Sequence, residues 1–170
     1  DPNKPPTTWP ELTLAAAKLK ASGSKCPYTT SWMSWIHLES FSLWHNVLFA
    51  TKNNGFGGLD ARYTFNTPLY VKHIQQFADW QKDKIFVYGG RTDLGNAKFN
   101  SGEVALYSAS SASYAGFKKT CQFEFGTAML PYWPDQKGAP QNTIIGGASL
   151  WVLNGFKPEE YKGVAAFFNY

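Results

Sequence analysis

The sequence has little charge and very little arginine. Only 16% of its 170 residues are charged, and its two arginines are Arg62 and Arg91. The lysines are scattered along the chain, so the net charge of +4 indicates a mildly basic surface that tolerates anionic ligands. Because arginine is a leading contact to phosphates and base edges in nucleic-acid-binding proteins, its scarcity argues against that class of protein.

Long apolar runs are absent as well. No stretch reaches the roughly 18 apolar residues that a membrane-spanning helix needs, and no signal peptide is recognisable. The sequence opens with DPNKPP and closes with AAFFNY inside an apolar helical pattern. Natural chain ends are usually polar and frayed, so we expect a processed or dissected piece of a longer protein.

Cysteine is scarce too. Cys26 and Cys121 lie far apart, without the spacing of a metal site. A single disulfide and two free thiols are both open interpretations.

The sequence also lacks the signatures of catalysis. The three histidines have no metal-binding spacing, and no GxSxG, GxGxxG or P-loop pattern occurs. The carboxylates are scattered, which is typical of solvated surface groups. We therefore expect a protein that is not an enzyme and that holds neither a metal nor a cofactor.

Apolar and aromatic residues are plentiful, at 44% and 17%, which indicates a folded chain with one sizeable core. A proline-rich linker is predicted over residues 1–8 and one α/β unit over residues 9–170. Capping residues and apolar spacing predict helices over 8–23, 31–49 and 95–102, from Ser110 to Lys119, and from Pro68 and Pro158 onward. Strands are predicted over 26–30, 104–109 and 123–130, with a hairpin over 51–65.

The alternation of strands and helices predicts a mixed central sheet flanked by helices. Apolar spacing predicts two core-facing helix surfaces, one made by Leu12, Ala16 and Leu19 and the other by Tyr70, Ile74, Phe77 and Ala78. Ligands of such folds gather at the carboxyl ends of strands, where helices begin.

Two tryptophans mark the first candidate site. Trp32 and Trp35 are three residues apart and share one face at the start of a predicted helix. Such a pair suits packing against the carbon skeleton of a ligand. Spacing alone favours the other interpretation, that both are core residues, because aromatic stripes on helices usually face a core.

Two further places suit an anion. Ser110 and Ser111 follow a predicted strand and begin a helix, where free N–H groups bind anions, although ordinary capping is the more common use. Gly146 and Gly147 interrupt an apolar stretch, which indicates a bulge or a close approach of a ligand to backbone amides. Two hydroxyls, free amides and two indoles together favour binding a small polar or anionic molecule without transforming it.

The same places carry a family resemblance. The matching stretches are SWMSWIHLESFSLWHNVLFATKNNGF (31–56), KFNSGEVALYSASSAS (98–113), FGTAMLPYWPD (125–135) and APQNTIIGGASLWV (139–152). Through them the chain resembles the solute-binding proteins of ABC importers, the family that includes maltose-binding protein. Within it, the resemblance is strongest to the glycerol-3-phosphate-binding proteins of Ugp-type importers.

The resemblance implies one lobe, the second, of a two-lobed type II periplasmic binding protein. It implies that Trp32 and Trp35 pack against a glycerol moiety, that Ser110 binds phosphate or a hydroxyl, and that the amide of Gly147 contacts phosphate. The spacers Met33 and Ser34 depart from the family pattern. The implied ligand is sn-glycerol 3-phosphate or a glycerophosphodiester such as glycerophosphocholine, and the implied partners are a missing first lobe and an inner-membrane permease, in the periplasm.

Three alternatives remain open. The same fold could bind a sugar or an oligosaccharide, since tryptophan rings stack on sugar faces. A small hydrolase would need carboxylates such as Glu39 and Asp60 to converge. A fragment with an exposed apolar face around Trp32 and Trp35 could instead associate with itself.

Overall fold

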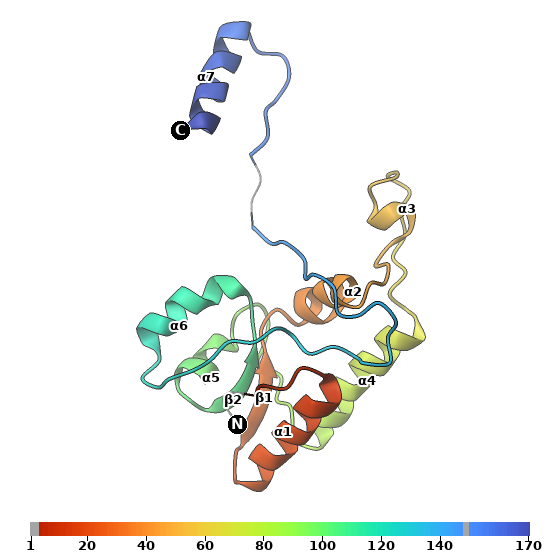
Figure 1. Ribbon diagram of the computed structural model, residues 1–170, viewed down its shortest axis with the longest axis vertical. Coiled ribbons are helices and arrows are strands. Elements are labelled where there is room, and N and C mark those ends of the chain that lie inside the picture. The colour runs from red at the N-terminus through yellow and green to blue at the C-terminus, as the bar shows by residue number, and fades with distance from the viewer. Residues whose placement is uncertain (1–3, 148–149) are drawn as a thin grey trace.

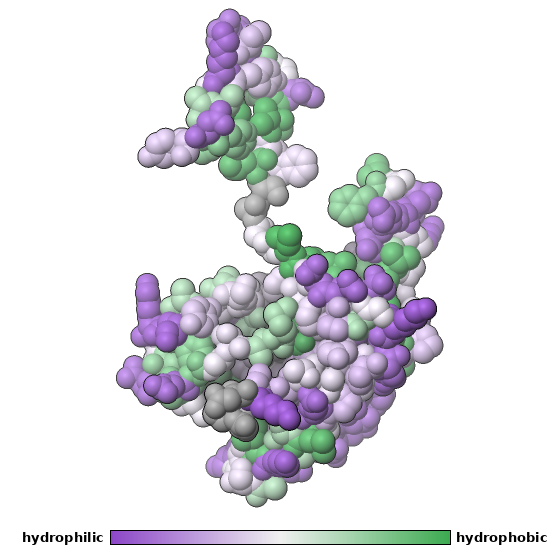
Figure 2. Space-filling view, viewed as in Figure 1, coloured by the Kyte–Doolittle hydropathy of each residue, from purple (hydrophilic) through white to green (hydrophobic). Residues whose placement is uncertain are grey.

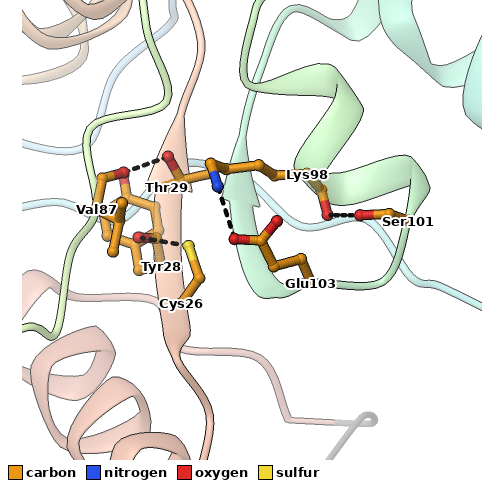
Figure 3. Close-up of polar contacts among 7 residues, drawn as sticks. All are labelled: Cys26, Tyr28, Thr29, Val87, Lys98, Ser101 and Glu103. Carbon is orange, nitrogen blue, oxygen red and sulfur yellow. Dashed lines mark hydrogen bonds and ion pairs between the residues drawn. The ribbon is translucent and has the colours of Figure 1, made fainter.

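Two parallel strands lie at the centre of the structure, a computed structural model that describes residues 4–147 and 150–170. β1 (Cys26–Thr30) pairs with β2 (Val104–Ser108) along its whole length. On its other edge, β1 forms a parallel bridge between Tyr28 and Phe86. Figure 3 shows Thr29 of β1 turned toward the carbonyl of Val87, to which its hydroxyl donates a hydrogen bond.

Helices flank this sheet, and the predicted α/β class is confirmed. Their bounds are α1 (Trp9–Ala21), the π-helix η1 (Trp35–Ser40), α2 (Phe41–Trp44), α3 (Thr51–Asn54), α4 (Pro68–Lys82), α5 (Asn96–Asn100), the 3₁₀-helix η2 (Ser111–Ser113), α6 (Tyr114–Thr120) and α7 (Pro158–Asn169). In Figure 1, α1 and α4 lie on one side of the strands and α5 and α6 on the other. None of the helices in the described part of the chain is long and apolar enough to cross a membrane.

Each side of the sheet has its own apolar cluster. The larger cluster joins α1, β1 and α4 and is rich in aromatic rings, among them Trp9, Tyr28, Phe77 and Trp80. The smaller cluster contains Cys26, Phe99, Val104 and Phe117, from β1, α5, β2 and α6. The predicted capping box starts α1, because the Thr8 hydroxyl accepts from the Glu11 amide (3.3 Å) and the Glu11 carboxylate accepts from the Thr8 amide (3.3 Å).

The buried face of α4 is rotated relative to the prediction. Tyr70 and Phe77 are buried as expected, but Ile74 is 39% exposed and Ala78 is exposed. The remaining buried positions are His73 and Trp80. The prediction was wrong at Ile74 and Ala78, because the buried face of α4 runs through His73, which packs there among aromatic rings.

The helical stretch predicted over residues 31–49 ends earlier, at Trp44. Asn46 has a left-handed backbone (φ 53°), and the Val47 amide donates to the Ser42 carbonyl at 2.9 Å. This is the Schellman arrangement that closes a helix, so Asn46 acts as its terminator.

Two predicted extended elements do not form as predicted in the described residues. The segment 123–130 is not a strand; its Phe125 packs against Phe99 (5.5 Å between ring centroids) and forms no ladder. The predicted hairpin over 51–65 retains one antiparallel bridge, between Ala50 and Tyr63. Its start forms α3 instead, where Lys52 and Asn53 adopt the left-handed conformation.

The two cysteines are free thiols in the structure. Cys26 is buried on β1, and Cys121 lies partly buried against the same cluster. Burial raises the pKa of the Cys26 thiol.

The part of the chain beyond Gln141 leaves the body, and α7 stands apart from it (Figure 1). Figure 2 shows hydrophobic side chains on the surface of this part. Apolar residues that are at least half exposed include Ile145, Leu150, Trp151, Val152, Leu153, Phe156 and Phe167. Residues 1–3 of the predicted linker and residues 148–149 of the APQNTIIGGASLWV stretch lie outside the described residues.

The buried face of α4 predicts which substitutions on this helix lower the free energy of unfolding. We expect Phe77→Ala to lower the free energy of unfolding by about 3–5 kcal/mol, because it removes a ring packed within the core. Ile74→Ala should change it by roughly 0.5 kcal/mol or less, since that side chain is largely outside the core. Urea denaturation measures both, and equal losses would contradict the assignment of the buried face.

Candidate ligand-binding site

The carboxyl ends of the two strands form one edge of the sheet. Thr30, the last residue of β1, lies opposite Ser108, the last residue of β2, and the next amide, of Ser31, donates to the Ser108 carbonyl at 3.0 Å. Trp32 and Ser110 each follow by two residues. Because paired strands lie about 4.8 Å apart, this ladder brings the first tryptophan and the first serine of the predicted site to the same edge.

Trp32 has an unusual backbone at this edge. Its φ is +45°, a left-handed value that costs a bulky residue about 1–2 kcal/mol. Its amide donates a 2.7 Å hydrogen bond to the Thr92 carbonyl, which holds the conformation. Trp32 is 43% exposed, so it is not a core residue.

Trp35 opens the π-helix η1, whose wider turns are rare and frequently lie at functional sites. Its side chain is half-buried. The interpretation of both tryptophans as core residues is therefore wrong for Trp32 and half right for Trp35. The core side of η1 is supplied by Ile36, His37 and Ser40.

Ser110 and Ser111 begin the turn after β2. The Ser110 hydroxyl accepts from the Ala112 amide at 3.3 Å, so it caps η2, and the side chain is partly exposed. Ser111 is the first residue of η2 and is exposed. Ordinary capping is thus present, and the partial exposure of Ser110 leaves its hydroxyl accessible beside the sheet edge.

Gly146 lies against the indole of Trp35. A Cβ atom placed on Gly146 would come within 3.2 Å of Trp35 Cζ2, which is tighter than most contacts of real Cβ atoms. Gly147 follows with φ +125°, a conformation that favours glycine, and a Cβ there would meet open space. The structure therefore brings Gly146 to the second tryptophan, as a close approach of backbone to side chain.

The sequence reasoning missed a chain of buried polar groups that ends at this edge. Trp133 Nε1–H donates to His73 Nδ1 (3.2 Å), and His73 Nε2 lies 3.3 Å from His37 Nδ1. His37 Nε2 lies 3.0 Å from Thr30 Oγ1. The signal available in the sequence was the spacing of Tyr70, His73 and Phe77, which places a histidine on a core face.

The donor at one end fixes the direction of the whole chain. Because an indole N–H only donates, His73 carries its proton on Nε2 and donates to His37. His37 in turn donates from Nε2 to Thr30, whose hydroxyl also accepts from Ser108 Oγ (2.8 Å) and donates to the Ser31 carbonyl (2.9 Å). Every ring nitrogen of the two histidines is thereby used, with both rings neutral.

The third buried histidine belongs to the same region. His45 Nδ1 donates to the Phe41 carbonyl (2.9 Å), and His45 Nε2 accepts from the Trp133 amide (2.9 Å). Burial lowers the pKa of His37 to about 3 and that of His45 to about 4, and it holds the pKa of His73 well below its ordinary value. These are structural histidines, and among residues 4–147 and 150–170 no cluster of metal-binding side chains occurs.

Comparison with known proteins gives the family. The family model described as bacterial extracellular solute-binding protein matches residues 2–170. The chain is 51% identical over 170 residues to the sn-glycerol-3-phosphate-binding periplasmic protein of Yersinia pestis, and 50% identical to that of Escherichia coli K12. Each match covers all of this chain and 39% of the relative, so the chain spans well under half the length of these curated proteins.

The contact between Gly146 and Trp35 makes one prediction. Gly146→Ala should push the indole from its position and lower the free energy of unfolding by about 0.5–1.5 kcal/mol, the cost of an off-rotamer side chain. The Trp35 Nε1–H signal in a ¹H–¹⁵N NMR spectrum should shift. Gly116→Ala in α6, where a Cβ meets nothing within 4 Å, is the matched control and should stabilise by roughly 0.5–1 kcal/mol. An unmoved Trp35 signal in the first variant would contradict the contact.

The buried histidines predict loss of stability in acid. Unfolded histidine titrates near pH 6.5, whereas the folded rings stay neutral down to about pH 4, so the unfolded state binds more protons in that range. The stability is complete above about pH 6.5 and falls by about 1.4 kcal/mol per pH unit for each histidine as the pH drops toward 4.

Urea denaturation between pH 7.5 and pH 4 measures this slope. His45→Gln should reduce the slope of the free energy of unfolding with pH by the contribution of about one proton. The charged groups that act on the His45 ring are Lys72 and Asp135. A free energy of unfolding that stays level from pH 6.5 to pH 4.5 would refute the neutral-histidine assignment.

Proposed function

The chain belongs to the bacterial extracellular solute-binding proteins, and on that premise we propose that it forms one half of a binding site for sn-glycerol 3-phosphate or a glycerophosphodiester. In this proposal, Trp32 and Trp35 supply an apolar wall for the glycerol carbons. The hydroxyl of Ser110 and the backbone amide of Gly147 bind the polar end, with Ser111 and Gly146 as further contacts.

The observation that carries the proposal is the convergence of these residues. Hydrogen bonding across the strand ends supports a position of Trp32 near Ser110, and the close packing of Gly146 on Trp35 supports a place for the glycine pair in the same site. Three segments far apart in the sequence thus support a single site, at the edge of a parallel sheet where α/β proteins bind ligands. The names of the relatives supply the ligand class.

The proposed site needs a second half. None of the six residues proposed for it is a cation, so the phosphate charge must be met from elsewhere. The exposed apolar residues around α7 support a neighbouring lobe that covers them. We propose that this chain is the second lobe, that the complete receptor acts in the periplasm without covalent chemistry, and that its closed form docks on an ABC permease.

A sugar or oligosaccharide is the second candidate ligand. The partly exposed indole of Trp32, next to the half-buried Trp35, favours it, because such rings also stack on sugar faces. The two candidates differ in what they need from Ser110, since only the phosphorylated ligand places an anion there.

Titration calorimetry on a chimaera tests the function. In it, this chain replaces the 170 residues that it matches in the E. coli relative, so that a complete receptor is measured. We expect binding of sn-glycerol 3-phosphate or glycerophosphocholine, and an affinity at least about tenfold lower after Trp32→Ala or Trp35→Ala, since 1.4 kcal/mol of lost packing is tenfold in affinity.

The matched control is Leu14→Ala, an exposed apolar position on α1, which should leave the affinity unchanged. Ser110→Ala should lower the affinity for the phosphorylated ligands and leave the affinity for a plain sugar unchanged. Binding of maltose in place of both phosphorylated ligands would move the assignment to the sugar reading, and a chimaera that folds but binds none of these ligands would refute both.

A further inference from the structure

The two ends of the segment that carries the two tryptophans are joined by a side-chain hydrogen bond to one hydroxyl group, that of Thr30. Thr30 lies before Trp32, and His37 follows Trp35 within the π-helix η1. His37 Nε2 donates to Thr30 Oγ1 at 3.0 Å, so one hydrogen bond closes a loop that contains both indoles. Thr30 and His37 are at most 1% exposed, which excludes water from competing for this bond.

The same hydroxyl joins this loop to the serine turn. Thr30 Oγ1 accepts from Ser108 Oγ at 2.8 Å, and Ser108 is two residues before Ser110. Tyr28 Oη lies 2.8 Å from Ser108 Oγ and so belongs to the same group of hydrogen-bonded side chains. Thr30 therefore connects the tryptophan segment to the serine segment, and His37 Nε2 lies 3.4 Å from Ser108 Oγ as well.

His37 has a single orientation in this arrangement. Its Nδ1 accepts from His73 Nε2 (3.3 Å), and His73 is fixed by Trp133 Nε1–H (3.2 Å). A rotated or flipped His37 ring would lose both of its partners in a buried environment, which is costly. The π-helix contributes by widening the turn in which His37 points inward while Trp35 stays half-exposed.

We propose that His37 is a positioning residue for the ligand-binding edge, acting through Thr30 and held by His73. It holds the strained backbone of Trp32 and sets the tryptophan pair relative to Ser110, without touching ligand itself. The assignment to a ligand rests on the proposed function, whereas the fastening of the edge can be measured without any ligand.

The first experiment measures hydrogen exchange by NMR on the 170-residue chain. The reporters are the amides of Ser31, which donates to Ser108 O, and of Trp32, which donates to Thr92 O. His37→Leu should lower their protection at least tenfold relative to β1 amides. His37→Gln, whose amide reaches the position of Nε2 and donates to Thr30, should restore most of it.

His45→Leu is the matched control, because His45 is equally buried but has no bond to Thr30. It should leave the ratio of edge to β1 protection unchanged. Equal effects of His37→Leu and His45→Leu would overturn the proposal, since a merely structural role predicts them. If His37→Leu does not fold, Thr30→Val replaces it, because this variant removes only the shared hydroxyl. The same ratio of edge-amide to β1-amide protection is then measured, and it should fall.

The second experiment measures the affinity of the chimaera for sn-glycerol 3-phosphate. His37→Leu or Thr30→Val should weaken binding at least fivefold, with His37→Gln near the parent value and His45→Leu unchanged. Lost edge protection with unchanged affinity would overturn the positioning role. A parent chimaera that does not bind would refute the proposed function instead, and the exchange ratios would still decide whether His37 fastens the edge.

Discussion

One hydrogen-bonded chain of neutral groups organises the middle of this protein. It starts at the indole N–H of Trp133, passes through His73 and His37, and ends at the hydroxyl of Thr30. Trp133 only donates, and each of the two histidines accepts at Nδ1 or Nε2 and donates from its other ring nitrogen, so a proton added to either ring would leave two donors facing each other. The larger core forms around this chain, and its aromatic rings supply the low-dielectric surroundings that keep the imidazoles uncharged.

The chain of hydrogen bonds also links parts of the sequence that share no regular secondary structure. Trp133 lies outside the helices and strands, and its backbone amide donates to His45 Nε2 as well. Thr30 and Ser108 lie at the carboxyl ends of neighbouring strands. A sheet of two paired strands has few ladder hydrogen bonds of its own, so these side-chain bonds fix the edge on which Trp32 adopts its strained backbone.

Local sequence patterns correctly predicted the features that depend on residues adjacent in the chain. The capping box of α1, the proline start of α4 and the strands at 26–30 and 104–109 follow from residues that are neighbours along the chain. The early end of the second helical segment, the absent strand at 123–130 and the buried His73 depend on backbone conformation or distant partners. The candidate site residues could be proposed from the sequence, but the packing of Gly146 on Trp35 needed the fold.

On the proposed function, a half-site of indoles, hydroxyls and amides, in which none of the six residues is a cation, suits a receptor that works by closure. On the same proposal, this half alone binds a phosphorylated glycerol weakly, because none of its six proposed residues carries a positive charge. Most of the binding free energy then arises only when a second lobe meets the ligand, so ligand binding and lobe closure are the same event. A preformed edge matters in such a scheme. If Trp32 and Ser110 became ordered only at closure, the free-energy cost of ordering them would lower the affinity of the closed state.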